Sequence, residues 1–401
     1  MINEEDIFLR RLDETSEKND LESSSATYAF LSETDNKNYK INMAGNSHDV
    51  YVVNRRGEVI VAGINPQGTN SLPDFSKFRN MEFLDVSGLT SEVGSLDLRL
   101  NNKLQDLRVL VRKIDEIYLP IEGLLNRILV ASENRKNRAR IYNLYQSSNL
   151  KYLRLRGGIK IDGIPNENLE VLNLANYRGE LKDEHCGINN LIFLSLPSIK
   201  GLTNCDYSIN TKLEYLYMNK VDSVIGIKLP NELVTLLLSG VKSDDLGFLS
   251  ENIALENLYL LDTEIKSLNG IESLTNLTRL EVRESEIDSL KPISGLKNLR
   301  EVNIFGSNVS TLSELSKLVN LEELYLDDAK ITSISGISNL TNLKELSLYN
   351  NPIQEIDVST LSNLKYCTVY LNTNTPALKK YTNLDNALYQ LSSKGTLPPL
   401  Q

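Results

Sequence analysis

The chain has 401 residues, enough for a large core, and its 43 basic and 53 acidic side chains give a formal net charge of −10. This acidic balance argues against general nucleic-acid binding. The three cysteines, Cys186, Cys205 and Cys367, are an odd number and too few for a disulfide framework, which fits a reducing compartment.

The two ends of the sequence show no targeting signal. The N-terminal stretch MINEEDIFLRRLDETSEKND is charged and lacks the apolar segment of a signal peptide. No run of about 18 apolar residues occurs, and the C-terminal KGTLPPLQ has no lipidation site. We therefore expect a cytoplasmic protein without membrane contact, and release as an effector by a route that needs no cleaved signal is left open.

Residues 1–75 form the first predicted segment, which does not share the periodicity of the rest. DVYVV and EVIVAG flank Asn54-Arg55-Arg56-Gly57, and this arrangement predicts a β-hairpin. We interpret the segment as a β-rich N-terminal cap, because the end repeat of a stacked array exposes its core. A separate small domain is the alternative.

Residues 76–375 contain a repeat with a period near 22 residues. Side chains alternate along a strand, so in L-x-L both leucines are predicted to point inward and the residues between them outward. Within the stretch from Leu321 to Ile353 the pattern L-x-x-L-x-L occurs twice, 22 residues apart, at Leu321, Leu324 and Leu326 and at Leu343, Leu346 and Leu348.

The residues after each strand are predicted to return in a tight helical or extended segment. Ile331, Ile334, Ile337 and Leu340 are spaced by three, the period of a 3₁₀-helix. A single unit buries too little apolar surface to offset the entropy of ordering its chain. The units must therefore stack, with their strands paired in parallel.

The middle leucine of the pattern can be followed through about 14 units. The longest unit carries ASENRKNRARIYNLYQSS, which predicts a loop or short helix projecting from the array. At the last middle position Cys367 is expected to act as a small buried apolar residue. The middle positions are Leu84, Leu107, Ile128, Leu153, Leu172, Leu194, Leu216, Leu236, Leu258, Leu280, Val302, Leu324, Leu346 and Cys367.

Residues 376–401 follow the last repeat. The stretch from Pro376 to Leu391 has helical periodicity and a proline at its start, which predicts a helical C-terminal cap. The final SSKGTLPPLQ is predicted to be a loose tail.

From Phe78 to Leu371 the chain resembles the 22-residue leucine-rich repeats of bacterial internalins and of phosphatase-regulating repeat proteins, and LTNLKELSLYNNPIQEIDVSTLSNL follows their pattern well. The resemblance implies an α/β solenoid. This would be a leucine-rich-repeat horseshoe whose concave parallel β-sheet binds protein and whose convex side is built of 3₁₀ and extended segments.

The chain departs from that family in the turn after the strand. The family places an asparagine three residues after the second strand leucine, and here Asn351 matches. We expect serine and threonine at this position to supply one hydrogen bond each, and backbone or water to satisfy the remaining turns. The other equivalent residues are Ala329, Ser307, Ser285, Thr263, Val241 and Val221.

The register also defines the predicted concave face, made of residues one before, one after and three after each middle leucine. Aromatic side chains on an exposed sheet are typical of protein contacts, although tyrosine also suits half-buried strands. Phe305, Asp327, Tyr349 and Tyr370 are expected to form one continuous column. Glu345 is also expected on this face, and the predicted partner-binding residues are Tyr215, Tyr217, Tyr259, Glu281, Arg283, Glu301, Phe305, Glu323, Tyr325, Asp327, Tyr349 and Tyr370.

Charge is distributed unevenly along the repeats. An acidic stretch covers residues 251–288, and a basic patch precedes it, which together suggest electrostatic steering of a polar partner. A merely solvated surface is the alternative, and RNA or phosphate binding at the basic patch is left open. The predicted basic patch comprises Arg135, Lys136, Arg138, Arg140, Arg154 and Arg156.

Catalysis finds little support in the sequence. His48 and His185 lie in no metal-ligand spacing, and no phosphate-binding glycine loop occurs. Cys205-Asp206 is similar to the thiol and carboxylate of bacterial repeat-containing ubiquitin ligases, but these carry a large helical catalytic domain. We predict no catalytic residue, metal, cofactor or small-molecule substrate.

The function predicted from these observations is non-catalytic binding of a protein partner on the concave face. The alternative is an adaptor or secreted effector in which residues 1–75 act and the repeats target them.

Overall fold

The computed structural model describes residues 40–44, 49–53, 58–64, 72–132, 139–165, 167–174, 177, 187–196, 206–221, 224, 226–353, 355–368, 380–382 and 388–389. The chain divides into two compact units, and each is treated by itself. Unit 1 comprises Met1–Val171 and Asn176–Glu180, and unit 2 comprises Leu172–Ala175 and Leu181–Gln401. Within the described residues, no helix is long and apolar enough to cross a bilayer.

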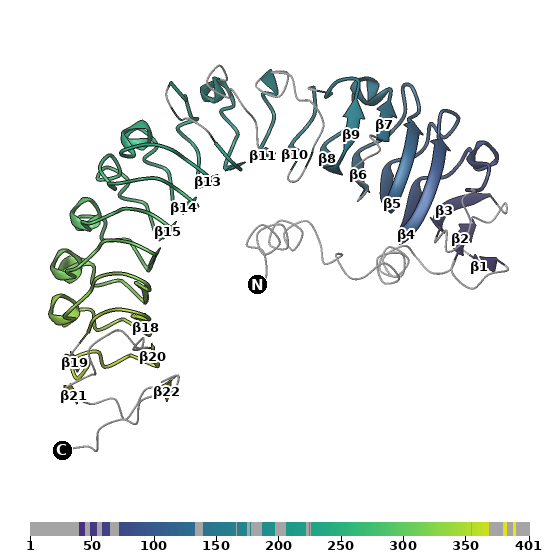
Figure 1. The fold of residues 1–401 in the computed structure, drawn as a ribbon. Coiled ribbons are helices and arrows are strands. Elements are labelled where there is room, and N and C mark those ends of the chain that lie inside the picture. Colours follow the sequence, from purple (N-terminus) through teal and green to yellow (C-terminus); the bar gives the residue numbers. More distant parts are fainter. Residues whose placement is uncertain are drawn as a thin grey trace. The chain divides into compact units, whose positions relative to one another are not determined.

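Unit 2 is a stack of turns whose strands pair in parallel (Figure 1). Each strand hydrogen-bonds to the strand of the next turn, and the 3₁₀ segments lie on the other side of the turns. Its strands are β11 (Phe193–Leu196), β12 (Tyr215–Met218), β13 (Thr235–Ser239), β14 (Asn257–Leu261), β15 (Arg279–Arg283), β16 (Glu301–Phe305), β17 (Glu323–Tyr325), β18 (Glu345–Ser347), β19 (Glu355–Asp357), β20 (Tyr366–Thr368), β21 (Lys380–Thr382) and β22 (Leu388–Tyr389). Its 3₁₀ segments are η5 (Tyr207–Ile209), η6 (Gly247–Leu249), η7 (Lys291–Ile293), η8 (Ser313–Lys317) and η9 (Ser335–Ile337).

The predicted register of unit 2 is confirmed strand by strand. From Leu194 in β11 to Cys367 in β20, each predicted middle residue pairs with the next one. These side chains are buried, including Cys367 at 3% exposure. Burial of one such leucine contributes about 1.5–3 kcal/mol, so the column of middle residues is a principal source of stability.

The predicted 3₁₀ return is also confirmed. Ile331, Ile334, Ile337 and Leu340 are all buried, and η9 lies among them. Glycines let successive turns approach closely here: a Cβ at Gly336 would lie 2.3 Å from the carbonyl carbon of Leu312.

In eight of the described turns a left-handed residue ends or follows the strand, four positions after the middle residue. Glycine takes this conformation without steric cost, whereas a side chain with a Cβ is disfavoured by about 1–2 kcal/mol. Asn and Asp tolerate it better than Glu or Lys, and the sequence analysis did not identify this position. The residues with positive φ here are Gly157, Lys220, Gly240, Asp262, Glu284, Gly306, Asp328 and Asn350.

The turn asparagine behaves as predicted at Asn351. Its Oδ1 accepts from the Ile331 amide at 2.9 Å, and its Nδ2 donates to the Leu326 and Tyr349 carbonyls. The expectation for serine and threonine is wrong: the hydroxyls of Thr263, Ser285 and Ser307 make no hydrogen bond within the described residues.

Backbone groups satisfy those turns instead. The amide of Glu286 donates to the Ile265 carbonyl at 3.0 Å, and that of Asn308 donates to the Ile287 carbonyl at 2.7 Å. These backbone hydrogen bonds join neighbouring turns without help from a side chain. The hydroxyls of Ser285 and Ser307, which stand where the family has asparagine, are therefore not needed to join the turns.

A second set of asparagines also joins the turns, and the sequence analysis missed it. Each lies four residues before a middle residue and donates its Nδ2 to a carbonyl of the preceding turn, at 2.8–3.1 Å. The N-L-x-x-L pattern was its signal. The asparagines are Asn276, Asn298, Asn320, Asn342 and Asn363.

Unit 1 begins with the predicted hairpin. Strands β1 (Lys40–Ala44), β2 (Asp49–Val53) and β3 (Val59–Ile64) pair antiparallel in sequence order. β3 also pairs in parallel with β4 (Phe83–Asp97), with Ala62 opposite Leu84. The stacked ladder therefore starts one turn earlier than predicted, since Ala62 stands 22 residues before Leu84 and replaces a leucine.

Several successive turns of unit 1 carry two parallel ladders. β4 and β5 (Asp106–Tyr118) are long enough to contribute to both. The first ladder continues through β6 (Arg127–Ser132) to β8 (Tyr152–Gly157), and the second through β7 (Ala139–Tyr142) to β9 (Ile159–Ile161). The remaining elements of unit 1 are η1 (Phe75–Lys77) and η2 (Leu144–Gln146), and the two units divide within β10 (Val171–Asn173).

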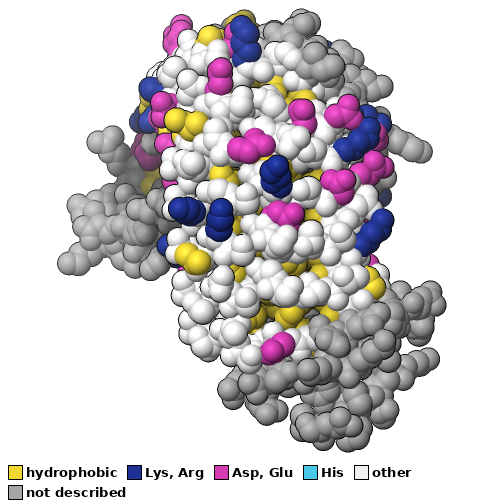
Figure 2. Space-filling view, turned by 90° about the vertical axis from the view of Figure 1, so that its left-hand side faces the viewer, with side chains coloured by type: hydrophobic (Ala, Val, Ile, Leu, Met, Phe, Trp, Pro, Cys, Tyr) yellow, Lys and Arg dark blue, Asp and Glu magenta, His cyan; other side chains and the backbone are white. Residues whose placement is uncertain are grey.

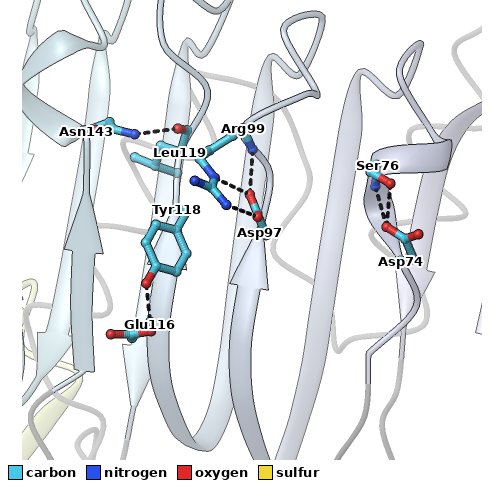
Figure 3. Close-up of polar contacts among 8 residues, drawn as sticks. All are labelled: Asp74, Ser76, Asp97, Arg99, Glu116, Tyr118, Leu119 and Asn143. Carbon is cyan, nitrogen blue, oxygen red and sulfur yellow. Dashed lines mark hydrogen bonds and ion pairs between the residues drawn. The ribbon is translucent and has the colours of Figure 1, made fainter.

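The second ladder carries a polar cluster on its surface, shown in part in Figure 3. Asp97, Tyr118 and Tyr142 lie opposite one another, and the two rings stack with centroids 4.7 Å apart. Arg99 pairs with Asp97 and lies over the Tyr118 ring, and the Tyr118 hydroxyl donates to Glu116 at 2.8 Å (Figure 3). The cluster thus links three successive turns by stacking and hydrogen bonds.

This ladder corrects the prediction for ASENRKNRARIYNLYQSS. Its described part is not a projecting loop: β7 pairs with β5 and β9, and η2 follows it. Ala139 and Ile141 are fully buried in this strand, which explains why the segment packs onto the array. Residues 133–138 lie outside the described residues.

The predicted C-terminal helix is not what the structure shows at its described residues. β21 pairs in parallel with β19, and β22 pairs in parallel with β20. An unpaired strand edge offers free amides and carbonyls, and these pairings satisfy them better than a helix lying across the edge. The rest of Pro376–Leu391 lies outside the described residues.

The left-handed position yields a stability test. Gly306→Ala is expected to lower the free energy of unfolding by about 1 kcal/mol, because alanine disfavours a positive φ. Its Cβ would lie 3.6 Å from the Glu284 Cα, an ordinary contact, so the cost is conformational. Glu284→Gly is expected to raise stability by about the same amount, measured by urea denaturation.

Gly295→Ala is the matched control, since its Cβ would meet open space and its φ is not positive. An equal loss of stability in Gly306→Ala and Gly295→Ala would contradict the conformational explanation.

Candidate functional site

The solvent side of the unit 2 sheet is the candidate site. Because the middle residues point into the core, the residues one before, one after and three after them share the opposite side of the sheet. We call this surface, from β15 to β20, the open sheet face.

A column of glutamates crosses the open sheet face. Glu301 lies opposite Glu323, and Glu323 lies opposite Glu345, in adjacent parallel strands about 4.8 Å apart. Arg279 stands at one end, opposite Glu301, and forms an ion pair with it at 2.9 Å. Glu323 therefore has a like charge on both sides, an arrangement that is destabilising in a sheet.

The phenol of Tyr325 lies between two of these carboxylates. Its hydroxyl is 2.5 Å from Glu345 Oε2 and 3.0 Å from Glu323 Oε2. Burial, the hydrogen bond to Glu345 and the charge of Glu323 raise the pKa of Tyr325 far above its usual value, so the phenol stays protonated. The Tyr325 hydroxyl can donate its proton to only one carboxylate at a time. The repulsion between Glu323 and Glu345 is therefore only partly offset.

The predicted column after the strands is present in its described part. Arg283 lies opposite Phe305 at the end of their strands. Asp327 accepts hydrogen bonds from the Ser347 hydroxyl at 2.7 Å and the Tyr349 amide at 2.8 Å. Burial raises the pKa of Asp327, and these hydrogen bonds oppose the shift. Tyr370 lies outside the described residues.

The exposed apolar surface of this face is aromatic. Phe305 is 37% exposed, Tyr349 39% and Tyr366 48%. Aromatic side chains that remain accessible beside carboxylates give a surface of mixed character, as in protein-binding sites. The sequence analysis missed Tyr366 and Arg279, although each stands one residue before a middle position.

Two residues predicted on the concave face are buried. Tyr217 is 6% exposed, with its ring 5.4 Å from that of Phe193, and Glu281 is fully buried. Glu281 pairs with Arg283 and lies 3.8 Å from Arg279. Tyr215 and Tyr259 are half-buried, and Arg279 lies over the Tyr259 ring at 5.2 Å. The alternation of residues along the strand predicted on which side of the sheet these side chains lie. It did not predict how far neighbouring side chains bury them.

The described members of the predicted basic patch belong to two different ladders of unit 1. Arg154 and Arg156 belong to β8 in the first ladder of unit 1, whereas Arg140 belongs to β7 in the second. Arg140 lies over the Tyr142 ring at 5.4 Å. Arg135, Lys136 and Arg138 lie outside the described residues.

The first ladder of unit 1 buries a small charged cluster. Asp85 is 3% exposed and lies 4.0 Å from Arg108, a long ion pair. Burial raises the pKa of Asp106 to about 6, and the nearby Arg127 opposes this shift. Asp106 is half-buried and the Arg108 side chain is 20% exposed, so this cluster keeps partly accessible charges.

The described residues give little support for catalysis or metal binding. They contain no group of three or more His, Cys, Asp or Glu that could hold a metal ion. Burial raises the pKa of the Cys367 thiol to about 12, so it is not a thiolate at neutral pH. His48, His185, Cys186 and Cys205 lie outside the described residues.

The side of unit 2 that carries the 3₁₀ segments contrasts with the open sheet face. In Figure 2, acidic and basic side chains are interspersed over it. Ion pairs such as Lys266 with Asp244 at 2.8 Å and Lys242 with Glu264 at 2.7 Å join opposite charges in neighbouring turns. A like-charge column such as that of the open sheet face is therefore not a general property of the surface.

Comparison with known proteins agrees with this architecture. Residues 319–366 match the family described as Leucine Rich repeats (2 copies). The chain thus has a leucine-rich-repeat fold of the internalin type. Comparison with curated protein sequences gave no match.

Solved structures extend the similarity over most of the chain. An internalin, InlF, of Listeria monocytogenes is 17% identical, covers 84% of this chain and 92% of its own, and has a TM-score of 0.51. A leucine-rich-repeat protein of Leptospira interrogans is 19% identical, covers 82% and 95%, and has a TM-score of 0.51. The plant peptide hormone receptor RGFR1, in complex with RGF2, is 17% identical, covers 79% and 56%, and has a TM-score of 0.51. Identities this low show the fold.

The glutamate column predicts an unusual stabilising substitution. Glu323→Gln is expected to raise the free energy of unfolding by up to about 1 kcal/mol, because it removes a charge flanked by Glu301 and Glu345. The gain should shrink in 1 M NaCl, where charges are screened within about 3 Å. Urea denaturation at low and high salt measures both effects.

Glu251→Gln serves as the control, since Glu251 is exposed in a turn and the substitution changes net charge equally. A loss of stability in Glu323→Gln would contradict the prediction, because it would mean that the Glu323 charge makes a net favourable interaction in the folded chain.

Proposed function

We propose that the chain is a non-catalytic protein-interaction module that binds a protein partner on the open sheet face of unit 2 and works in the cytoplasm. The observation that carries the proposal is the set of accessible aromatic side chains beside the glutamate column: Phe305, Tyr349 and Tyr366 are 37%, 39% and 48% exposed.

Rigid aromatic side chains suit this role because they offer a large contact area and lose little conformational freedom on binding. Phe305 ends β16, Tyr366 begins β20, and Tyr349 lies in the turn after β18, so the backbone beneath them is held by the paired strands before a partner arrives. Preorganisation of this kind lowers the entropic cost of binding.

The structural neighbours favour the same class of function. One of them, RGFR1, is in complex with RGF2, and internalins share the fold. The described residues contain no cluster that could hold a metal ion, and the Cys367 thiol is buried and protonated. We therefore favour binding over catalysis as the function. The partner itself is not defined by these similarities.

A double substitution tests the binding surface. Phe305→Ala with Tyr349→Ala is expected to weaken partner binding at least tenfold, about 1.4 kcal/mol, because both side chains would contribute to the contact. The melting temperature should change little, since both are partly exposed. Peptides selected from a phage-displayed library on the wild-type chain provide the ligands, and fluorescence anisotropy measures their affinity.

Ile253→Ala with Val319→Ala is the matched control, because these residues are 56% and 47% exposed but lie in turns outside the open sheet face. Selected peptides that bind the folded Phe305/Tyr349 variant as tightly as the wild type would place the binding surface elsewhere.

We also propose that the segment before the repeats acts as a cap rather than as an independent effector. β3 completes the ladder against β4, and Ala62 and Ile64 are buried at 0% and 4% exposure. A strand so integrated supports stability, and this favours the cap over the adaptor hypothesis.

Deletion of residues 1–75 is therefore expected to expose the edge and core of β4 and to give an insoluble or aggregated chain. Size-exclusion chromatography of the deletion variant measures this. A soluble, monomeric remnant with an unchanged melting temperature would instead support a separate functional segment.

A further inference from the structure

The charge of the open sheet face narrows the chemistry of its partner. From β16 to β20, its described positions hold the carboxylates Glu301, Glu323, Glu345 and Asp327 and no lysine or arginine. Arg279 pairs with Glu301, at the edge of this stretch. The acidic character thus increases toward β17 and β18, beside the accessible aromatics.

Among the described residues, no lysine or arginine pairs with the central glutamates. Glu323 and Glu345 lie opposite each other, and the single Tyr325 hydroxyl lies within 3.0 Å of both. Lys344 and Arg300 lie on the strand-entry side and pair with Glu322 instead. An incoming cation would therefore relieve a repulsion that the unbound sheet retains.

We propose that the open sheet face binds a basic segment of a protein partner, with an arginine between Glu323 and Glu345 and apolar side chains against Phe305 and Tyr349. This inference rests on the proposed function and specifies the partner of the same surface.

The geometry favours arginine over lysine. The two carboxylates stand on neighbouring strands about 4.8 Å apart. A guanidinium presents five N–H donors in a planar fork and can bond both carboxylates at once, whereas an ammonium is a compact point charge. Partly buried surroundings, which already raise the pKa of Tyr325, strengthen such a contact.

The aromatic side chains of the open sheet face are expected to contact apolar residues of the partner. Phe305 and Tyr349 flank Asp327 in the column after the strands. Apolar residues of the partner, placed on either side of its arginine, could cover both rings. A partner with basic residues alone would leave the rings uncovered, so the mixed composition is part of the proposal.

The experiment uses the full chain and a phage-displayed library of random 12-residue peptides. The selected peptides are expected to be enriched in arginine beside apolar residues. Glu323→Gln with Glu345→Gln should weaken their binding at least tenfold, measured by fluorescence anisotropy. Replacing the peptide arginine by lysine should weaken binding several-fold, and affinity should fall as salt rises.

A charge-matched variant separates this site from general attraction to an acidic protein. Glu232→Gln with Glu251→Gln changes the net charge equally, in exposed turns of unit 2. It is expected to change affinity less than twofold. Equal losses in the two double variants would overturn the inference. Circular dichroism confirms that each variant is folded.

The outcomes also distinguish this inference from the proposed function. Peptides that require Phe305 and Tyr349 but bind equally well without the two glutamate charges would overturn the basic-segment inference and leave the binding surface in place. A selection in which no peptide depends on Phe305 and Tyr349 would contradict both.

Discussion

The stacking of one turn on the next is the interaction on which the whole structure depends. No turn can bury its leucines alone, and each middle residue lies beside its equivalents in the neighbouring strands. Parallel backbone pairing fixes this alignment, and a slip by one residue would move every leucine to the opposite side of the sheet. The same alignment that builds the core therefore determines which side chains share the open sheet face.

Sequence periodicity was sufficient to predict this alignment where leucine marks the position, as at Leu324 and Leu346, and even where Cys367 replaces it. The prediction failed where a small residue occupies the middle position, as at Ala62. Alanine is common at buried and exposed positions alike, so it does not identify the register. The prediction also failed for the second ladder of unit 1, since long strands that bend between two ladders have no fixed repeat of their own. At the described residues of the predicted C-terminal helix, Lys380–Thr382 and Leu388–Tyr389, pairing with a strand edge overrode local helical periodicity.

The candidate site was predictable only in part, and for a related reason. Alternation along a strand identifies the side on which Tyr217 and Glu281 lie, but burial on that side depends on neighbours such as Phe193 and Arg283. The facing of Glu323 and Glu345 followed from the register, whereas the position of the Tyr325 hydroxyl between them required side-chain geometry. Sequence thus predicted the surface, and structure defined its chemistry.

The glutamate column illustrates how a stacked array can carry a function that its stability does not require. Facing like charges cost up to about 1 kcal/mol, whereas each buried leucine of the adjoining core contributes about 1.5–3 kcal/mol. Because the charges and the leucines lie on opposite sides of the same strands, the unfavourable contact does not disturb packing. A repeat can therefore retain an electrostatically unfavourable surface that becomes favourable only when a cationic partner binds.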